Sequence, residues 1–189
     1  MKIIDITQEL FSCRVFPGDS PPIFERVKTI DRDKYNLTNI SMCVHNGTHI
    51  DAPNHFIANG KAVHELDLTR FYGECTVVAF IGTITTDDIA PILKKCHKRL
   101  LIKGDCVLSD NAALTIADSH VCLIGMENQS VGNIESPMDS HIALLQKEIV
   151  LLEGLDLSSA KVGEYVLAAF PLKLQGADGS PVRAVLIEI

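Results

Sequence analysis

The stretch from His45 to Phe56 reads HNGTHIDAPNHF and gathers side chains that bind metals. Its twelve residues include His45, His49, Asp51 and His55, which are three of the chain's seven histidines and one carboxylate. Imidazole nitrogens and carboxylate oxygens are the usual ligands of zinc and also suit manganese and iron. A chance cluster of ordinary surface or core histidines is the alternative. Four ligand-type side chains in so short a stretch favour a functional site.

The same stretch is predicted to be a shaped loop rather than a regular element. Gly47 and Thr48 interrupt it, and Pro53 is incompatible with a helix interior. A loop can bend back and bring side chains at positions i, i+4 and i+6 around one ion. Cys43, two residues before the stretch, is expected near this site.

Length and composition predict one soluble globular domain spanning residues 1–189. Apolar residues make up 47% of the chain and charged residues 22%, which is ordinary for a globular protein. The formal charge of −7 and the absence of a Lys/Arg run argue against nucleic acid and anionic membranes as partners. The six cysteines show no C-x-x-C spacing, so we expect small buried hydrophobes rather than disulfides.

The first residues, MKIIDITQEL, resemble a strand and lack the features of a signal peptide. No run of apolar residues approaches the length of about 18 that a membrane helix requires. We therefore expect a cytoplasmic protein.

Hydrophobic patterning predicts a mixed α/β fold in which strands outnumber helices. The expected strands cover residues 2–6, 23–30, 38–45, 73–82, 99–107, 120–128, 149–155, 165–175 and 181–189, and the expected helices cover 86–96, 109–118 and 136–148. The strand over 38–45 is expected to deliver His45 from its end.

Two further ligand-type residues lie in apolar surroundings. His141 opens the apolar part of a helix, and Glu153 ends the apolar run IVLLE. A buried carboxylate without a partner is costly and loses its charge. Glu153 is therefore either an exposed residue at a strand end or paired, with a metal, Arg183 or a lysine as its partner.

Three polar residues are candidates for the wall of a substrate pocket. Asp19 lies in the rigid segment PGDSPP, where an ordinary turn residue is the alternative. Gln129 and Ser130 follow the predicted strand HVCLIGMEN and so lie near its carboxyl end. His64 lies outside the dense cluster, and a structural or surface role is favoured over a place in the pocket.

The stretch HNGTHIDAPNHF resembles the signature H-x-G-T-H-x-D-x-P-x-H-F of the metal-dependent cyclase family, which includes bacterial kynurenine formamidases. Four more segments carry the resemblance, in the family's order: PGD at 17–19, GMENQSVG at 125–132, EGLDL at 153–157 and PLKLQGADGSPVRAVLI at 171–187. The likeness thus extends over most of the chain.

The resemblance implies a swivelling β/β/α architecture, with a barrel-like mixed core and flanking helices, and a homodimer or homotetramer. It implies one or two divalent metals per subunit, zinc foremost and otherwise manganese or iron, with the ligands His45, His49, Asp51, His141 and Glu153. Asp51 would bridge the two metal positions, and His55 would be the acid/base residue.

One segment departs from the family pattern. Kynurenine formamidase-like members carry an R-T-G-W type stretch with aromatic neighbours, whereas residues 102–113 read IKGDCVLSDNAA and the chain has no tryptophan. A flat aromatic substrate normally contacts aromatic walls. The departure weakens the expectation of an aryl substrate.

The predicted activity is metal-dependent hydrolysis of a small N-formyl amide, cyclic amide or ester, similar to that of an arylformamidase. The metal would activate a water and polarise the carbonyl, while His55 shuttles a proton near pH 7. The alternatives are a metal-binding family member without turnover and a dehydrating cyclase.

Overall fold

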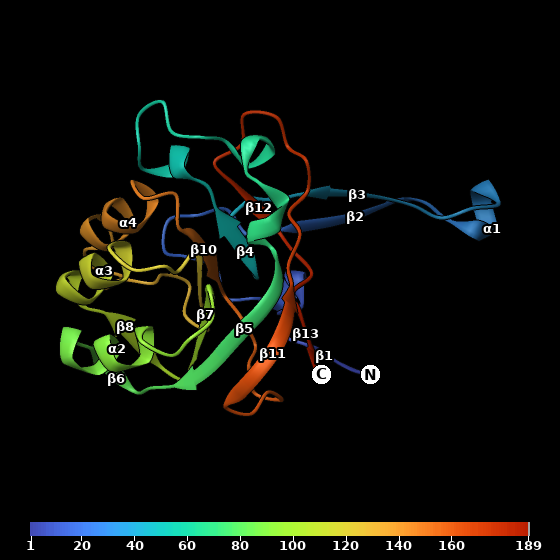
Figure 1. Cartoon of the computed structure of the whole chain (residues 1–189). Coiled ribbons are helices and arrows are strands. Elements are labelled where there is room, and N and C mark those ends of the chain that lie inside the picture. The colour runs from blue at the N-terminus through green and yellow to red at the C-terminus, as the bar shows by residue number, and fades with distance from the viewer. Residues whose placement is uncertain (189) are drawn as a thin grey trace.

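A computed structural model describes residues 1–188, in which nine strands form one curled mixed sheet (Figure 1). In sheet order these strands are β1 (Lys2–Asp5), β13 (Val185–Glu188), β11 (Gly163–Ala168), β5 (Tyr72–Ala79), β7 (Arg99–Lys103), β9 (Leu123–Met126), β10 (Val150–Glu153), β4 (His49–Asp51) and β12 (Gly179–Pro181). This architecture agrees with the expected mixed, barrel-like sheet.

The centre of the sheet is parallel and is covered on both faces. Strands β5, β7, β9 and β10 run parallel, and the segments between them carry helices that lie together on one side of the sheet (Figure 1). The helices are α2 (Thr86–Leu93), α3 (Asp110–Ala117) and α4 (Met138–Leu145). Parallel strands buried on both faces are expected to be continuous apolar runs, which is how these strands read.

Alternation along each central strand divides the core into two clusters. Leu100 and Ile102 of β7 pack with the helices, whereas Leu101 points to the opposite face, inside the curl of the sheet. Strand β10 behaves in the same way, with Leu151 on the helix side and Leu152 inside the curl.

The short strand β4 lies between β10 and β12 and is antiparallel to both. Its register places His49 opposite Glu153 on one side and opposite Pro181 on the other. Segments distant in the sequence therefore meet at one edge of the sheet.

Two smaller pairs of strands complete the fold. Strands β6 (Gly82–Ile84) and β8 (Cys106–Leu108) pair in parallel beside the helices. Strands β2 (Ile23–Lys28) and β3 (Leu37–Ser41) form an antiparallel hairpin that carries α1 (Ile30–Asp33) at its tip. This hairpin arm, residues 23–41, projects far from the body of the protein (Figure 1).

Several predicted boundaries are wrong. The strand before His45 ends at Ser41, so His45 lies in the following loop, and His49–Asp51 is a strand rather than part of a loop. The predicted strand over 181–189 is interrupted, since β12 ends at Pro181 and β13 begins at Val185, and its last residue lies outside the described part.

No helix among residues 1–188 is long and apolar enough to cross a membrane.

Candidate metal centre

Three elements bring four ligand-type side chains together. His49 and Asp51 are alternate residues of β4, so they point to the same face while Ile50 between them is fully buried on the other. Glu153 ends β10 directly opposite His49, and His141 comes from α4. All four are buried.

The distances within this group match the spacing of ligands around one ion. His49 Nε2 lies 3.4 Å from a Glu153 oxygen and 3.5 Å from Asp51 Oδ1. His141 Nε2 lies 3.3 Å from the other Glu153 oxygen and 3.7 Å from Asp51 Oδ2. Nitrogen and oxygen ligands bind zinc at about 2.0–2.1 Å, which separates tetrahedral ligand atoms by about 3.3–3.4 Å.

The outer nitrogens of both histidines are held by backbone carbonyls. His49 Nδ1 donates to Gly47 O at 2.9 Å, and His141 Nδ1 donates to Pro137 O at 2.7 Å. This is the arrangement that orients metal-ligating histidines, because it turns Nε2 toward the ion. Asp51 Oδ2 is buried without a hydrogen-bond partner among the described residues. The donor set therefore fits a divalent cation.

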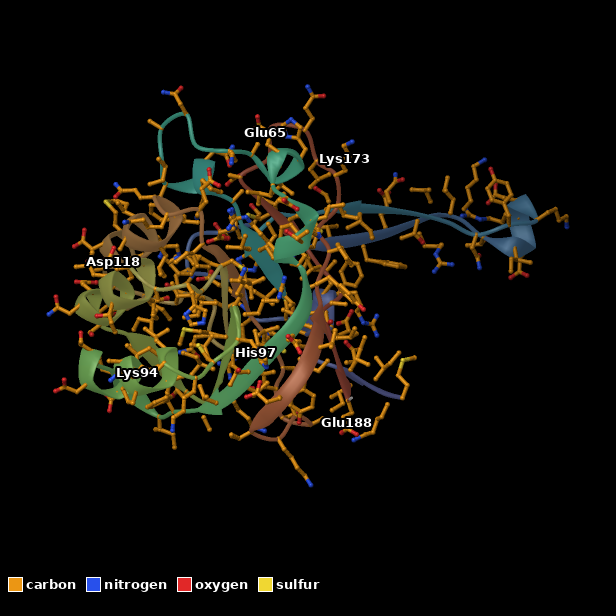
Figure 2. The ribbon with its side chains drawn as sticks, viewed as in Figure 1. Glu65, Lys94, His97, Asp118, Lys173 and Glu188 are labelled. Atoms are coloured by element: carbon orange, nitrogen blue, oxygen red, sulfur yellow. The ribbon has the colours of Figure 1, made fainter. Side chains whose placement is uncertain are left out.

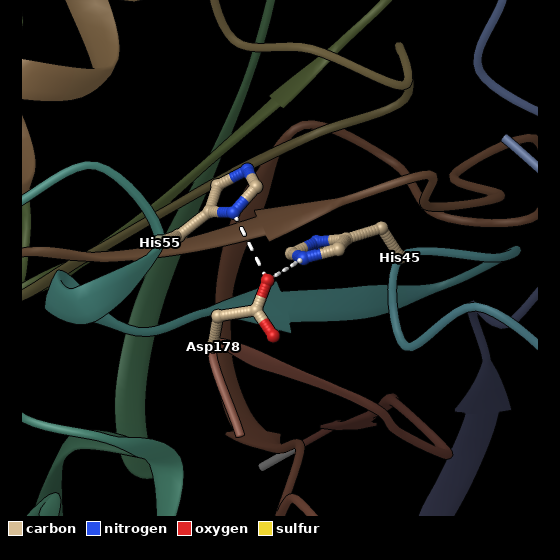
Figure 3. A group of neighbouring side chains, drawn as sticks. All are labelled: His45, His55 and Asp178. Atoms are coloured by element: carbon tan, nitrogen blue, oxygen red, sulfur yellow. Dashed lines mark hydrogen bonds and ion pairs between the residues drawn. The ribbon is translucent and has the colours of Figure 1, made fainter. Parts of the chain in front are cut away.

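His45 is placed differently from the other four predicted ligands. Its Nδ1 lies 2.8 Å from Asp51 Oδ1. Its Nε2 lies 2.8 Å from Asp178 Oδ2, the contact that Figure 3 shows. These are hydrogen-bond distances. His45 still belongs to a potential metal-binding group with His49 and Asp51, and its ligation requires that Nδ1 give up its proton.

The carboxylates raise the pKa of three histidines, and the shift is large at His45 and His141. Asp51 and Glu153 outweigh burial at His49 and raise its pKa. Burial opposes the charged form at His45, but hydrogen bonds and attraction from Asp51 and Asp178 outweigh burial and raise its pKa to about 9. Burial is likewise outweighed at His141, where Glu153 and Asp51 raise the pKa to about 9. Both imidazoles are thus protonated at pH 7 until a cation replaces the protons.

Metal binding is therefore expected to release protons and to strengthen as the pH rises. At a pH below their pKa of about 9, His45 and His141 must each lose a proton to become ligands. Each proton lost changes the apparent metal affinity about tenfold per pH unit. Titration calorimetry with Zn²⁺ at pH 7, in two buffers of different ionisation enthalpy, measures the number released. We expect at least one, and release of none would contradict this arrangement.

The predicted pocket residues line the same cavity as the side chains of the metal centre. The cavity has a volume of about 220 Å³ and includes Asp19, Gln129 and Ser130. Both side-chain polar atoms of Gln129 and the Ser130 hydroxyl are buried without protein partners among the described residues. Phe16 and Phe56 add apolar walls that the sequence reasoning did not find.

A larger hollow of about 380 Å³ lies elsewhere, around Arg14, Asp105 and Asn128, and has no histidine in its wall. The smaller cavity is the candidate site because it contains the ligand-type side chains.

Other sequence predictions are settled by the neighbours of each residue. Arg183 pairs with Asp5, with its Nε 3.0 Å from Asp5 Oδ1, so Arg183 as the partner of Glu153 is excluded. His64 lies outside the cavity and accepts a hydrogen bond from the Gly176 backbone, as its structural alternative predicted. Cys43 lies near the site, with its Sγ 3.7 Å from Asp19 Oδ2.

Asp178 is the polar residue that sequence reasoning missed. Its Oδ2 contacts His45 Nε2 and also lies 3.2 Å from Nδ1 of His55 (Figure 3). It is separated from His45 by 133 positions, so no local spacing indicated it. The one available signal was its place inside the motif GADGSPVRA.

Comparisons with known proteins show the family and the fold. Residues 4–110 match a family described as "Putative cyclase". A structure described as a potential metal-dependent hydrolase with cyclase activity is 26% identical, with a TM-score of 0.84, and the match covers 98% of this chain and 96% of the other.

A predicted metal-dependent hydrolase from Bacillus stearothermophilus is 27% identical, with a TM-score of 0.83, over 98% of this chain and 97% of the other. Isatin hydrolase A from Labrenzia aggregata shares the fold, with a TM-score of 0.85 at 22% identity over 98% of this chain and 93% of the other.

Proposed function

This chain belongs to the cyclase family, and from that premise we propose that it is a metal-dependent hydrolase of a small amide, either an N-formyl amide or a cyclic amide, or of an ester. The observation that carries the proposal is the pair of histidines whose Nε2 atoms face the carboxylates of Asp51 and Glu153 at 3.3–3.7 Å. Two structures of more than 25% identity are described as metal-dependent hydrolases, which supports the same reaction class.

The metal centre supplies the electrophilic part of the reaction. His49, Asp51, His141 and Glu153 would hold the ion, with His45 as a further ligand. A bound divalent cation polarises a carbonyl and lowers the pKa of a water toward neutrality.

His55 is placed to move the proton. Its ring lines the cavity, and its Nδ1 faces Asp178, which leaves Nε2 for the substrate. Burial lowers the pKa of His55 below 6.5, so the ring is neutral at pH 7 and can accept a proton from the attacking water. The same nitrogen then returns that proton to the leaving nitrogen or oxygen.

The walls of the cavity favour a small substrate with one polar end. Gln129 and Ser130 offer buried polar atoms that have no partner within residues 1–188, and these atoms suit a carbonyl or an N–H group. Phe16 and Phe56 provide an apolar surface for a ring. No residue from 102–113 lines this cavity, so the departure in that segment does not remove its aromatic walls.

Product mass tests the reaction class. The Zn²⁺-loaded or Mn²⁺-loaded protein is incubated with N-formyl aniline, small lactams and small esters, and products are analysed by mass spectrometry. We expect gain of one water by at least one substrate. Loss of one water would indicate a dehydrating cyclase, and inertness with metal bound would indicate a binding protein.

We also propose that the chain forms a homodimer through the hairpin arm. A two-stranded hairpin is marginal by itself, and exposed apolar side chains commonly mark an interface. The arm exposes six large apolar side chains, namely Ile23, Phe24, Ile30, Tyr35, Leu37 and Ile40. Light scattering is expected to give twice the chain mass of 20.7 kDa, and a monomer at micromolar concentration would refute the dimer.

A further inference from the structure

The backbone of Asp178 is hydrogen-bonded to the residue that follows β4. Its backbone carbonyl accepts a hydrogen bond from Ala52 N at 2.8 Å. The next residue is Gly179, where a Cβ atom would lie 2.7 Å from Cε1 of His45. The His45 ring therefore packs directly on the backbone beside Asp178, and a larger residue at position 179 would displace it.

One oxygen of Asp178 is shared by two histidines. Oδ2 lies 2.8 Å from His45 Nε2 and 3.2 Å from His55 Nδ1, and the two rings lie 4.1 Å apart between centroids (Figure 3). An ionised carboxylate only accepts hydrogen bonds, so each of these nitrogens must carry a proton. The shared contact consequently determines which nitrogen of each ring is left for other partners.

The contact with Asp178 has a different consequence for each ring. At His45 the other nitrogen, Nδ1, lies 2.8 Å from the Asp51 carboxylate, so it also carries a proton until a cation replaces that proton. At His55 the remaining atom is Nε2, on a ring that lines the cavity. A carboxylate behind a histidine commonly fixes its tautomer and its orientation in this manner.

We propose that Asp178 is a positioning residue that orients the rings of His45 and His55 and fixes the tautomer of His55. It thereby links a residue of the metal centre to the residue that moves protons, through a single oxygen atom. Asp178 is not among the residues that line the cavity, and its side chain is 45% exposed. The catalytic consequence of this inference rests on the proposed function, whereas the tautomer of His55 does not depend on it.

The tautomers are measured directly by ¹⁵N NMR of the histidine rings in wild-type protein and in Asp178→Asn. In the wild type we expect His55 as the Nδ1–H tautomer at pH 7.5. In Asp178→Asn we expect a shift of His55 toward the Nε2–H form, because the ionised acceptor is gone. Asp118→Asn is the matched control, since Asp118 lies on the surface and pairs with Lys147. A wild-type His55 in the Nε2–H form, or a variant with an unchanged tautomer, would overturn the proposal.

Metal affinity and kinetics supply the second readout. Loss of a group that orients a metal ligand typically weakens metal binding about 10–100-fold, and we expect that loss in Asp178→Asn with unchanged stoichiometry. At saturating metal, kcat should fall while KM stays constant. Complete loss of one ion would make Asp178 a ligand and would also overturn the proposal. Because the NMR measurement needs no substrate, it decides the inference even if the proposed hydrolase activity fails.

Discussion

Replacing Asp51 with Asn is expected to empty the metal centre and to lower kcat/KM about a thousandfold or more. Asp51 is buried and lies between His49 and His141. Its Oδ1 is 3.5 Å from His49 Nε2, and its Oδ2 is 3.7 Å from His141 Nε2. Metal catalysis contributes several kcal/mol, and about 1.4 kcal/mol corresponds to a factor of ten. Elemental analysis and steady-state kinetics measure the two effects.

The matched control for this substitution is Asp118→Asn. Asp118 belongs to an exposed surface pair, and its side chain lies at the periphery of the molecule (Figure 2). The control should keep full metal content and full activity. If Asp51→Asn retained both metal content and activity, Asp51 would not be a ligand, and the expectation that it bridges two metal positions would be wrong.

Replacing His55 with Gln is expected to lower kcat about 10²–10⁴-fold while the metal stays bound, because general acid/base catalysis contributes a factor of this size. His55 lies with His45 and Asp178 in a group whose spacing could also hold an ion, but it belongs neither to the group of His45, His49 and Asp51 nor to that of Asp51, His141 and Glu153. Glutamine keeps a polar side chain of similar length but cannot transfer a proton at neutral pH. Kinetics with the metal-loaded variant measure the change in kcat, and elemental analysis measures the metal.

His64→Gln is the control for this second variant. His64 also follows the metal-binding stretch, but it lies outside the cavity, and a glutamine oxygen can still accept from the Gly176 backbone. It should retain wild-type kcat. Loss of metal in His55→Gln would indicate that His55 is a ligand, and unchanged kcat would exclude it as the proton shuttle.

The central strands were predictable because their signal is local. Runs such as RLLIK at 99–103 are apolar on both faces, as strands covered on both faces must be. The strand His49–Asp51 was predicted as loop because three residues between Gly47 and Pro53 are too short to show a period of two. It becomes a strand only through pairing with distant segments.

Part of the site was predictable because its sequence signal is also local. The dense stretch indicated His49 and Asp51, whereas His141 and Glu153 were joined to them through the resemblance to a family and not through spacing. Asp178 could not be placed, because its contact with His45 depends on the register of β12 against β4. Strands were predicted within the hairpin arm, but the sequence did not indicate that their large apolar side chains are exposed.

The most direct test of the metal-dependent reaction is removal and return of the metal. The purified protein is treated with a chelator, dialysed and titrated with Zn²⁺ or Mn²⁺, while bound metal and turnover of an amide or ester substrate are measured at each step. We predict that turnover disappears with the metal and returns in proportion to the metal bound, up to one or two ions per chain. Undiminished turnover by the metal-free protein would contradict the account.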